Sequence, residues 1–249
     1  RYDRLSQRWF VVLINVSTPN RILVAVSNAA SAGVVSAGTV WTYFFLSIDT
    51  APPSIPNSCL MDYPTLGIDA NALYVGGNNF CGSPTQTYHS SDGWVIRKSS
   101  VLSSGPIVAT VFWALATPSV SGPYTPQGVD NYDPAAAEGY FVGVDVLSYG
   151  KLFLRRVGSP GVTPTISANV SVSNVSATLA PLNVPHLGNA YPTYGVLDAL
   201  DDRLFAAHLR SGKLVTAHNI GVNAVGAATG TVSRTATRWY EITGVAAPG

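Results

Sequence analysis

Short apolar runs of strand length follow one another along the chain and are separated by residues that favour turns. Stretches such as 21–27 (RILVAVS) and 139–147 (GYFVGVDVL) are rich in β-branched and aromatic residues. No window keeps the i, i+3, i+4, i+7 apolar spacing of an amphipathic helix. The pattern therefore predicts an all-β protein, with further strands over 73–77, 107–115, 165–173, 203–209 and 237–242.

Two short sequences recur within the chain and give it a period. The segment 63–68 (YPTLGI) returns as 191–196 (YPTYGV), and 150–152 (GKL) returns at 212–214. The first pair is about twice as far apart as the second, which indicates a repeating unit of about 60 residues. On this grid four glycines are expected in turns, each followed by a strand: Gly38, Gly93, Gly150 and Gly212.

Serial units of three or four strands are typical of a β-propeller, because one twisted blade cannot bury both of its faces alone. We predict a single β-propeller domain over 1–249, with about four visible blades at 1–56, 57–116, 117–182 and 183–249. A two-sheet sandwich gives no reason for such a period, and a β-helix has a much shorter one. The propeller is therefore favoured over both.

The charge content narrows the class of partner. The 249 residues include 14 Lys and Arg and 13 Asp and Glu, a net charge of +1. Without a large net charge there is no long-range field to attract nucleic acid or an anionic membrane, and the basic residues are scattered along the sequence. No stretch approaches the roughly 20 apolar residues of a membrane span. Neither nucleic-acid binding nor a membrane span is expected.

Several longer segments resemble a known type of protein. They are 2–9 (YDRLSQRW), 23–27 (LVAVS), 62–69 (DYPTLGID) and 238–241 (RWYE). Over most of its length the chain resembles uncharacterised secreted bacterial β-propeller proteins. The resemblance implies a propeller fold and secretion, and it carries no catalytic residue across. It also implies that the blades belong to a larger ring, with a closed four-bladed ring as the alternative.

Cys59 and Cys81 are the only cysteines. We predict that they form a disulfide, which for a loop of this size stabilises the fold by roughly 3 kcal/mol in the chain-entropy model. Two separate buried thiols are the alternative. A disulfide in a chain with few charges indicates an oxidising compartment and an extracellular location.

A pair of carboxylates is the sharpest enzymatic hypothesis, since glycoside hydrolysis needs two of them roughly 5–10 Å apart. Asp62 and Asp69 flank the repeated YPT segment and are the best candidates. Their odd separation places them on opposite faces of an unbroken strand, so capping of turns is the favoured role. The Asp-box of sialidases is absent from the sequence. No catalytic residue is assigned.

Metal binding has little support in the sequence. His208 and His218 are predicted on two strands joined by a two-residue turn at Ser211 and Gly212, which sends them to opposite faces and excludes a shared zinc ion. Three carboxylates, Asp198, Asp201 and Asp202, form a weak calcium candidate, for which a solvated turn is the favoured alternative. No cofactor is expected.

Tyrosines are the strongest signal for a ligand. Tyr124, Tyr132 and Tyr140 lie in or beside a Pro- and Gly-rich segment, 117–137, that is predicted to be a long loop. Aromatic rings with a polar tip suit the faces of sugars. These three residues are the predicted ligand-binding set.

The sequence favours a non-catalytic, secreted module that binds carbohydrate or another extracellular surface. This prediction rests partly on analogy between folds. One alternative is a glycan-cleaving enzyme that uses Asp62 or Asp69. The other is a structural subunit of an extracellular assembly, which would self-associate.

Overall fold

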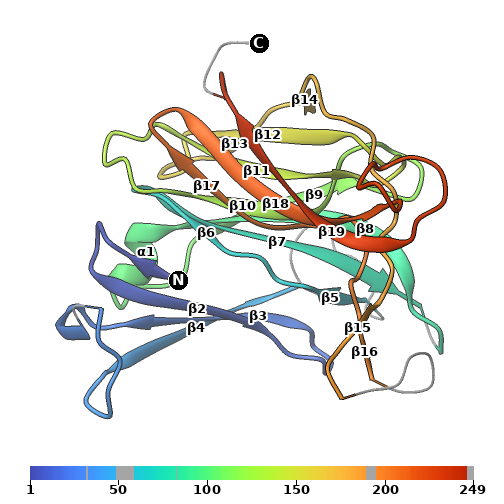
Figure 1. The fold of residues 1–249 in the computed structure, drawn as a ribbon. Helices are drawn as coiled ribbons and strands as arrows, with labels where there is room; N and C mark the ends of the chain where they lie inside the picture. Colours follow the sequence, from blue (N-terminus) through green and yellow to red (C-terminus); the bar gives the residue numbers. More distant parts are fainter. Residues whose placement is uncertain (32, 49–58, 83, 189–194, 246–249) are drawn as a thin grey trace.

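The computed structural model describes residues 1–249 except 32, 49–58, 83, 189–194 and 246–249. The prediction of an all-β protein is confirmed: strands dominate, and they form several sheets, none of them closed (Figure 1). The helical elements of the described residues are the 3₁₀ turn η1 (Ala29–Ser31) and the five-residue helix α1 (Lys98–Leu102). No helix among these residues is long and apolar enough to cross a membrane.

The N-terminal sheet contains four antiparallel strands in chain order. They are β1 (Tyr2–Asp3), β2 (Arg8–Ile14), β3 (Arg21–Ser27) and β4 (Trp41–Ser47). One face is apolar and buried, as the alternating burial of β3 shows. The outer face is also apolar but exposed, and includes Leu13, Tyr43 and Phe45.

The middle sheet follows, in the order β5-β7-β8-β9 with β6 paired to β7. Its strands are β5 (Leu60–Asp62), β6 (Gly67–Ile68), β7 (Ala72–Cys81), β8 (Thr87–Arg97) and β9 (Ala109–Ala116). The predicted disulfide is confirmed: Cys59 and Cys81 are bonded, and join the start of β5 to the end of β7.

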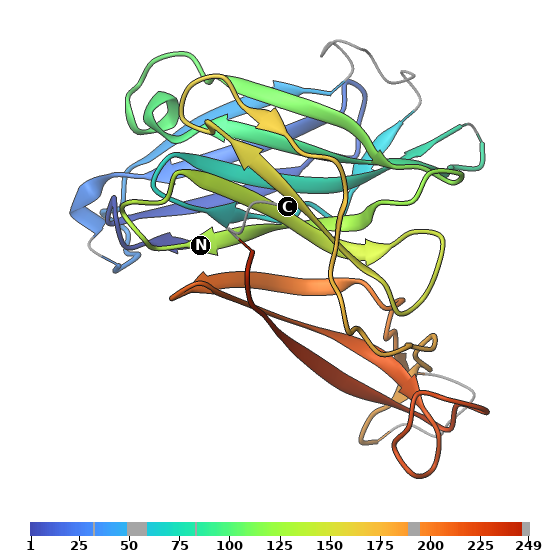
Figure 2. The same ribbon diagram turned by 90° about the horizontal axis from the view of Figure 1, so that it is seen from above.

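The C-terminal sheet has eight strands. These are β10 (Pro123–Asn131), β11 (Glu138–Asp145), β12 (Leu152–Gly158), β13 (Thr165–Ile166), β14 (Val170–Ser171), β17 (Leu204–Arg210), β18 (Lys213–Val222) and β19 (Arg234–Ile242). Its two halves meet where β10 pairs in parallel with β17, and Figure 2 shows β17–β19 splaying away from that line. A separate small sheet pairs β15 (Val184–Pro185) with β16 (Val196–Leu197).

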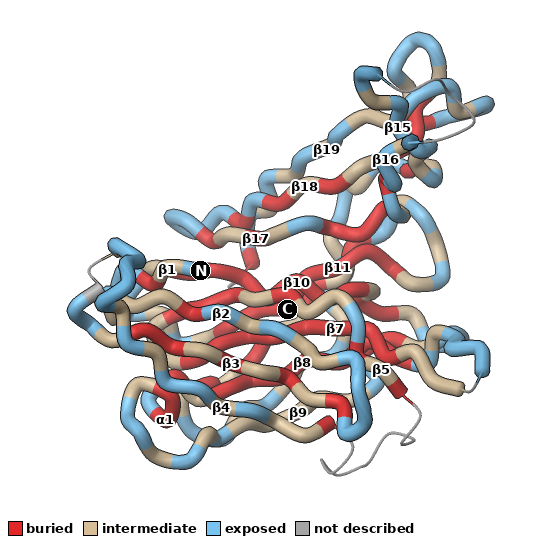
Figure 3. The backbone as a smooth tube through the Cα atoms, turned by 90° about the horizontal axis from the view of Figure 1, so that it is seen from below, coloured by how far each residue is buried: buried red, intermediate tan, exposed pale blue. Residues whose placement is uncertain are grey.

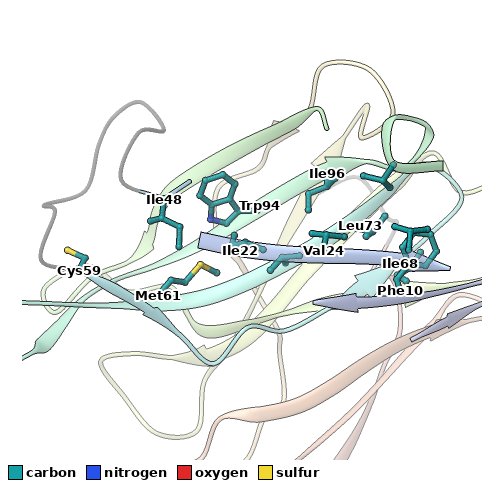
Figure 4. Packing of buried hydrophobic residues seen from close by; sticks show 13 residues of the cluster. Phe10, Ile22, Val24, Ile48, Cys59, Met61, Ile68, Leu73, Trp94 and Ile96 are labelled. Carbon is teal, nitrogen blue, oxygen red and sulfur yellow. The ribbon is translucent and has the colours of Figure 1, made fainter. Parts of the chain in front are cut away.

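Apolar packing connects the sheets in series. The middle sheet is buried on both faces, as the run of buried residues along β7 shows (Figure 3). Because side chains alternate along a strand, Leu73 and Val75 face the N-terminal sheet, while Tyr74 packs against Phe141 of β11. Figure 4 shows the first of these cores, in which Phe10, Ile22 and Val24 lie against the middle sheet.

Glycines bring the middle and C-terminal sheets unusually close together. A Cβ on Gly76 would lie 1.8 Å from the carbonyl oxygen of Pro126, and one on Gly128 would lie 2.2 Å from that of Tyr74. A Cβ on Gly139 would lie 2.0 Å from the Tyr74 ring. At these positions the backbone packs directly against the backbone or ring of the other sheet. Any residue larger than glycine would overlap it.

The propeller prediction goes beyond what the structure shows. A ring needs its first and last sheets to cover each other. The described strands leave the outer face of the N-terminal sheet exposed, and Trp239 on β19 is 68% exposed. The architecture that the structure supports is therefore an all-β stack of several open sheets.

Two local predictions are wrong. Gly93 is not in a turn but in the middle of β8, where Phe141 would be 2.8 Å from an added Cβ, and the residues after β8 form α1. The centre of the predicted loop 117–137 is strand β10. Pro126 is tolerated there because the pairing with β11 shifts register between Tyr124 and Gln127, so its missing N–H removes no ladder hydrogen bond.

We predict that Gly128→Ala lowers the free energy of unfolding by about 3 kcal/mol or more, because the added methyl group meets backbone that cannot move aside. Urea denaturation measures the effect. Gly38→Ala is the matched control, since its nearest neighbour, the hydroxyl of Ser36, is 3.8 Å away. Equal stability of the G128A variant and the wild type would contradict the close approach of the sheets.

Candidate binding site

An arginine held between two tyrosines lies where the middle and C-terminal sheets meet. The guanidinium carbon of Arg203 lies 4.6 Å from the centre of the Tyr63 ring and 5.2 Å from that of Tyr124. Arg203 immediately precedes β17, Tyr63 follows β5, and Tyr124 lies in β10. Such cation–π contacts strengthen as the groups lose water, and the Arg203 side chain is only 10% exposed.

Asp201 also holds the Arg203 side chain in place. Its Oδ1 accepts a hydrogen bond from Nε of Arg203 at 2.8 Å, and its Oδ2 accepts one from Nη2 at 2.7 Å. The tyrosine hydroxyl of Tyr124 accepts a further, longer bond from Nη2 at 3.3 Å. A bidentate pair of this kind fixes direction as well as charge. The guanidinium is therefore held in one orientation.

A cavity of about 230 Å³ lies beside the stack, and we call it the tyrosine pocket. Its lining residues are Tyr124, Val144, Asp145, Val146, Leu147, Ser148, Tyr149, Asp201 and Asp202. Asp145 organises the loop after β11, because its carboxylate accepts hydrogen bonds from the Ser148 hydroxyl at 2.7 Å and from the Leu147 backbone N–H at 3.3 Å. These bonds fix the loop that forms one part of the pocket lining.

Asp202 is a buried carboxyl group in the lining of the pocket. Its Oδ2 accepts a hydrogen bond from the Thr178 hydroxyl at 3.1 Å. Burial raises the pKa of Asp202 to about 6; the Thr178 bond opposes this rise, and the charge of Asp201 adds to it. Burial likewise raises the pKa of Tyr124, which the nearby Arg203 partly offsets.

The two predicted carboxylates Asp62 and Asp69 have different environments. Asp69 is buried and caps a turn: its Oδ1 accepts the N–H groups of Asn71 and Ala72 at 2.7 and 2.8 Å, and its Oδ2 accepts the Tyr74 hydroxyl at 2.5 Å. Asp62 is exposed at the end of β5, within electrostatic reach of Tyr63 and Tyr124. The structure therefore does not present Asp69 to a ligand.

Of the three predicted tyrosines, only Tyr124 lines the tyrosine pocket. Tyr140 is 3% exposed and packs in the core between β11 and the strands β17 and β18. Tyr132 lies beyond the far end of β10, between Arg4 and Arg210. The three therefore do not form one site.

The three carboxylates of the weak calcium candidate have different partners and do not converge on one point. Asp198 accepts the N–H of Leu200 at 2.8 Å, Asp201 pairs with Arg203, and Asp202 is buried. Among the described residues, no group of three or more His, Cys, Asp or Glu side chains is placed to hold a metal ion.

The predicted two-residue turn at Ser211 and Gly212 joins β17 to β18. Arg210 pairs with Lys213 and His208 with Val215. Ser211 and Gly212 both have positive φ, at 48° and 75°, as a type I′ turn requires. An irregularity in the pairing between Leu204 and Ala207 then places Leu204 opposite His218. His208 is half-exposed and His218 is buried.

Sequence reasoning missed Arg203, Tyr63 and Tyr149. Tyr63 opens the repeated YPT segment and was noted only as part of a repeat. The second copy falls mostly on residues 191–194, which lie outside the described residues. Arg203 directly follows the acidic residues at 201 and 202, so a search for charge pairs within this turn would have found it.

Comparison with known proteins gives one weak likeness. No protein-family model matches the chain, and no curated protein is similar to it in sequence. A solved structure described as polysaccharide lyase Uly1 superposes with a TM-score of 0.38 and 9% identity, over 95% of this chain and 46% of that one. The chain thus spans less than half the length of that structure. A likeness of this size assigns neither a family nor an activity.

We predict that Asp202 makes stability depend on pH. Its raised pKa means that the folded state holds the proton more tightly than the unfolded chain, so this contribution is present below about pH 4 and is lost as pH rises through about 6. Between pH 4 and 7, the free energy of unfolding measured in urea should fall by roughly 1–2 kcal/mol less in the Asp202→Asn variant than in the wild type.

Burial also raises the pKa of Asp92 to about 6. Asp92 therefore adds the same pH dependence of stability to the wild type and to the Asp202→Asn variant. At pH 4 the two proteins should have similar stability. Parallel curves over the whole range would contradict the burial of an ionisable group at position 202.

Proposed function

We propose that the chain is a non-catalytic binding module whose tyrosine pocket holds one ring of a carbohydrate. The observation that carries this proposal is the convergence of Tyr124, Tyr149 and Asp201 around a small cavity next to an immobilised arginine. Aromatic rings can pack against the C–H faces of a sugar, and carboxylates and backbone groups accept and donate hydrogen bonds to its hydroxyls.

The size of the cavity supports a small occupant. Its volume of about 230 Å³ is below the roughly 300–1,000 Å³ typical of sites for larger organic ligands. A single sugar ring, with the rest of an oligosaccharide outside, suits that volume. Tyr149 is 50% exposed, so its ring is available to a ligand before binding.

Rigidity of the site supports binding without a large entropic cost. Arg203 is fixed by two rings and a carboxylate, and the loop after β11 is fixed by Asp145. A site whose groups are already ordered loses little freedom when the ligand arrives.

We also propose that the successive strand groups are blades of a β-propeller in a secreted protein, divided at 1–56, 57–116, 117–182 and 183–249. Antiparallel neighbours within each range, and apolar packing between the ranges, support this division. The disulfide is compatible with folding in an oxidising compartment. The exposed outer face of the N-terminal sheet would be covered in a ring.

We predict that Tyr149→Ala weakens oligosaccharide binding at least about tenfold, because the exposed ring is the main apolar contact for a sugar. Isothermal titration of a panel of neutral and acidic tetrasaccharides against wild type and variant measures this. Tyr43→Ala is the matched control. Tyr43 is 74% exposed on the outer face of the N-terminal sheet, so its loss should leave oligosaccharide affinity unchanged.

Equal losses in Y149A and Y43A would contradict the assignment of the pocket. Absence of binding to every oligosaccharide in the panel would contradict the proposed carbohydrate function itself.

A further inference from the structure

A second group of side chains gathers at the other end of β10. The parallel pairing of β10 and β17 places Asp130 beside His208, and Tyr132 lies next to Arg210 in the same direction along the strands. Arg1, which precedes β1, contacts Asp130, and Arg4, which follows β1, contacts Tyr132. We call Arg1, Arg4, His208 and Arg210 the cationic cluster, with Tyr132 at its centre.

The cluster contains more positive than negative charge. Asp130 is its carboxylate, with Oδ2 at 3.4 Å from Nε of Arg1 and 3.3 Å from Nδ1 of His208, and its side chain is 2% exposed. Among the described residues, neither Arg4 nor Arg210 has a carboxylate within ion-pair distance. Both guanidinium groups instead lie over the Tyr132 ring, with their carbons 5.5 and 4.3 Å from its centre.

Two like charges on one ring repel each other unless an anion lies between or above them. Both arginines are exposed, while the one carboxylate is turned inward to hydrogen-bond the backbone N–H of Ile68 at 2.9 Å. The groups that face solvent are therefore the guanidinium groups of the two arginines and the imidazole of His208, whose side chain is 43% exposed. The planar fork of arginine matches a carboxylate in geometry.

A separate cavity of about 410 Å³ is lined by residues of both groups. They are Arg1 of the cationic cluster and Tyr63 of the arginine stack, with Gln127 of β10 beside them. Tyr124 and Tyr132 are separated by at most about 26 Å along the chain, at about 3.3 Å per residue. That span corresponds to a short oligosaccharide rather than to a monosaccharide.

From this arrangement we infer that the ligand is an acidic oligosaccharide, with a carboxylate on the cationic cluster and a ring in the tyrosine pocket. This inference rests on the proposed carbohydrate function and names the class of ligand. The aromatic end supplies packing and the cationic end supplies selectivity for charge, as a polar rim does at other binding sites.

The test compares a tetragalacturonate with its methyl ester, which has the same backbone without the charges. Calorimetry at low salt should show the acid binding wild type at least about tenfold more tightly than the ester. In the double variant Arg4→Ala, Arg210→Ala this preference should fall to about one while binding of the ester is unchanged. Arg234→Ala, which removes an exposed arginine on β19, is the control and should keep the preference.

Equal affinity of wild type for acid and ester would overturn the inference and leave the proposed function standing. So would a preference that survives in the double variant. A single-stranded DNA of equal charge is the second probe, and binding as tight as that of the tetragalacturonate would overturn the assignment to a carboxylated sugar.

If neither saccharide binds, the proposed function fails, and the cluster is then judged alone. Titration of sodium galacturonate into the labelled protein should shift the amide resonances of Tyr132, His208 and Arg210. No shift there would overturn the anion site as well.

Discussion

The close contact between the middle and C-terminal sheets determines where β10 lies, and β10 carries a residue of each proposed site. Gly76 and Gly128 let the backbones of β7 and β10 approach until a single added methyl group would overlap the opposite chain. The Thr65 hydroxyl bridges the same contact, because it donates to the Pro126 carbonyl at 2.6 Å and accepts the Gly76 N–H at 3.0 Å. Protein interiors tolerate such packing only when each side chain matches it.

A buried polar network then fixes the start of β10. Asn78 of β7 donates to the Thr125 hydroxyl at 2.7 Å and accepts the Thr125 backbone N–H at 3.0 Å, which holds that residue at a φ of 46°. Ser91 donates to the same asparagine, and the Tyr88 ring packs edge-on against Tyr124 at 5.2 Å. Because buried polar groups are costly unless they are paired, this network favours one position of the strand. Tyr124 is therefore directed towards Arg203.

The sequence predicts much of the strand content, because strands of this fold are short, apolar and separated by turn residues. Residues 21–27 are β3 as predicted, and Cys59 and Cys81 are joined. Other features depend on contacts between distant segments. Gly93 has the sequence context of a turn, and only Phe141, far along the chain, shows that it is a contact within a strand. The two prolines near 123–126 read as loop because the compensating register shift is not visible locally.

Only part of the candidate site could be predicted from the sequence, because its other residues are brought together by contacts between distant segments. Tyr124 and the acidic turn at 201–202 could be found from residue type alone, since aromatic and carboxylate groups are the usual lining of such sites. The Tyr63 ring could not be assigned to the site, because the stack joins residues that lie far apart in the sequence and belong to two sheets. The positions of Tyr132 and Tyr140 depended on strand register, which the supposed loop concealed.

A crystal structure of the protein with a bound acidic oligosaccharide tests the account most directly. The account predicts a sugar ring against Tyr124 and Tyr149 with a hydroxyl on Asp201, and a carboxylate of the same ligand between Arg4 and Arg210 at Tyr132. A ligand on the outer face of the N-terminal sheet, with the tyrosine pocket empty, would contradict it.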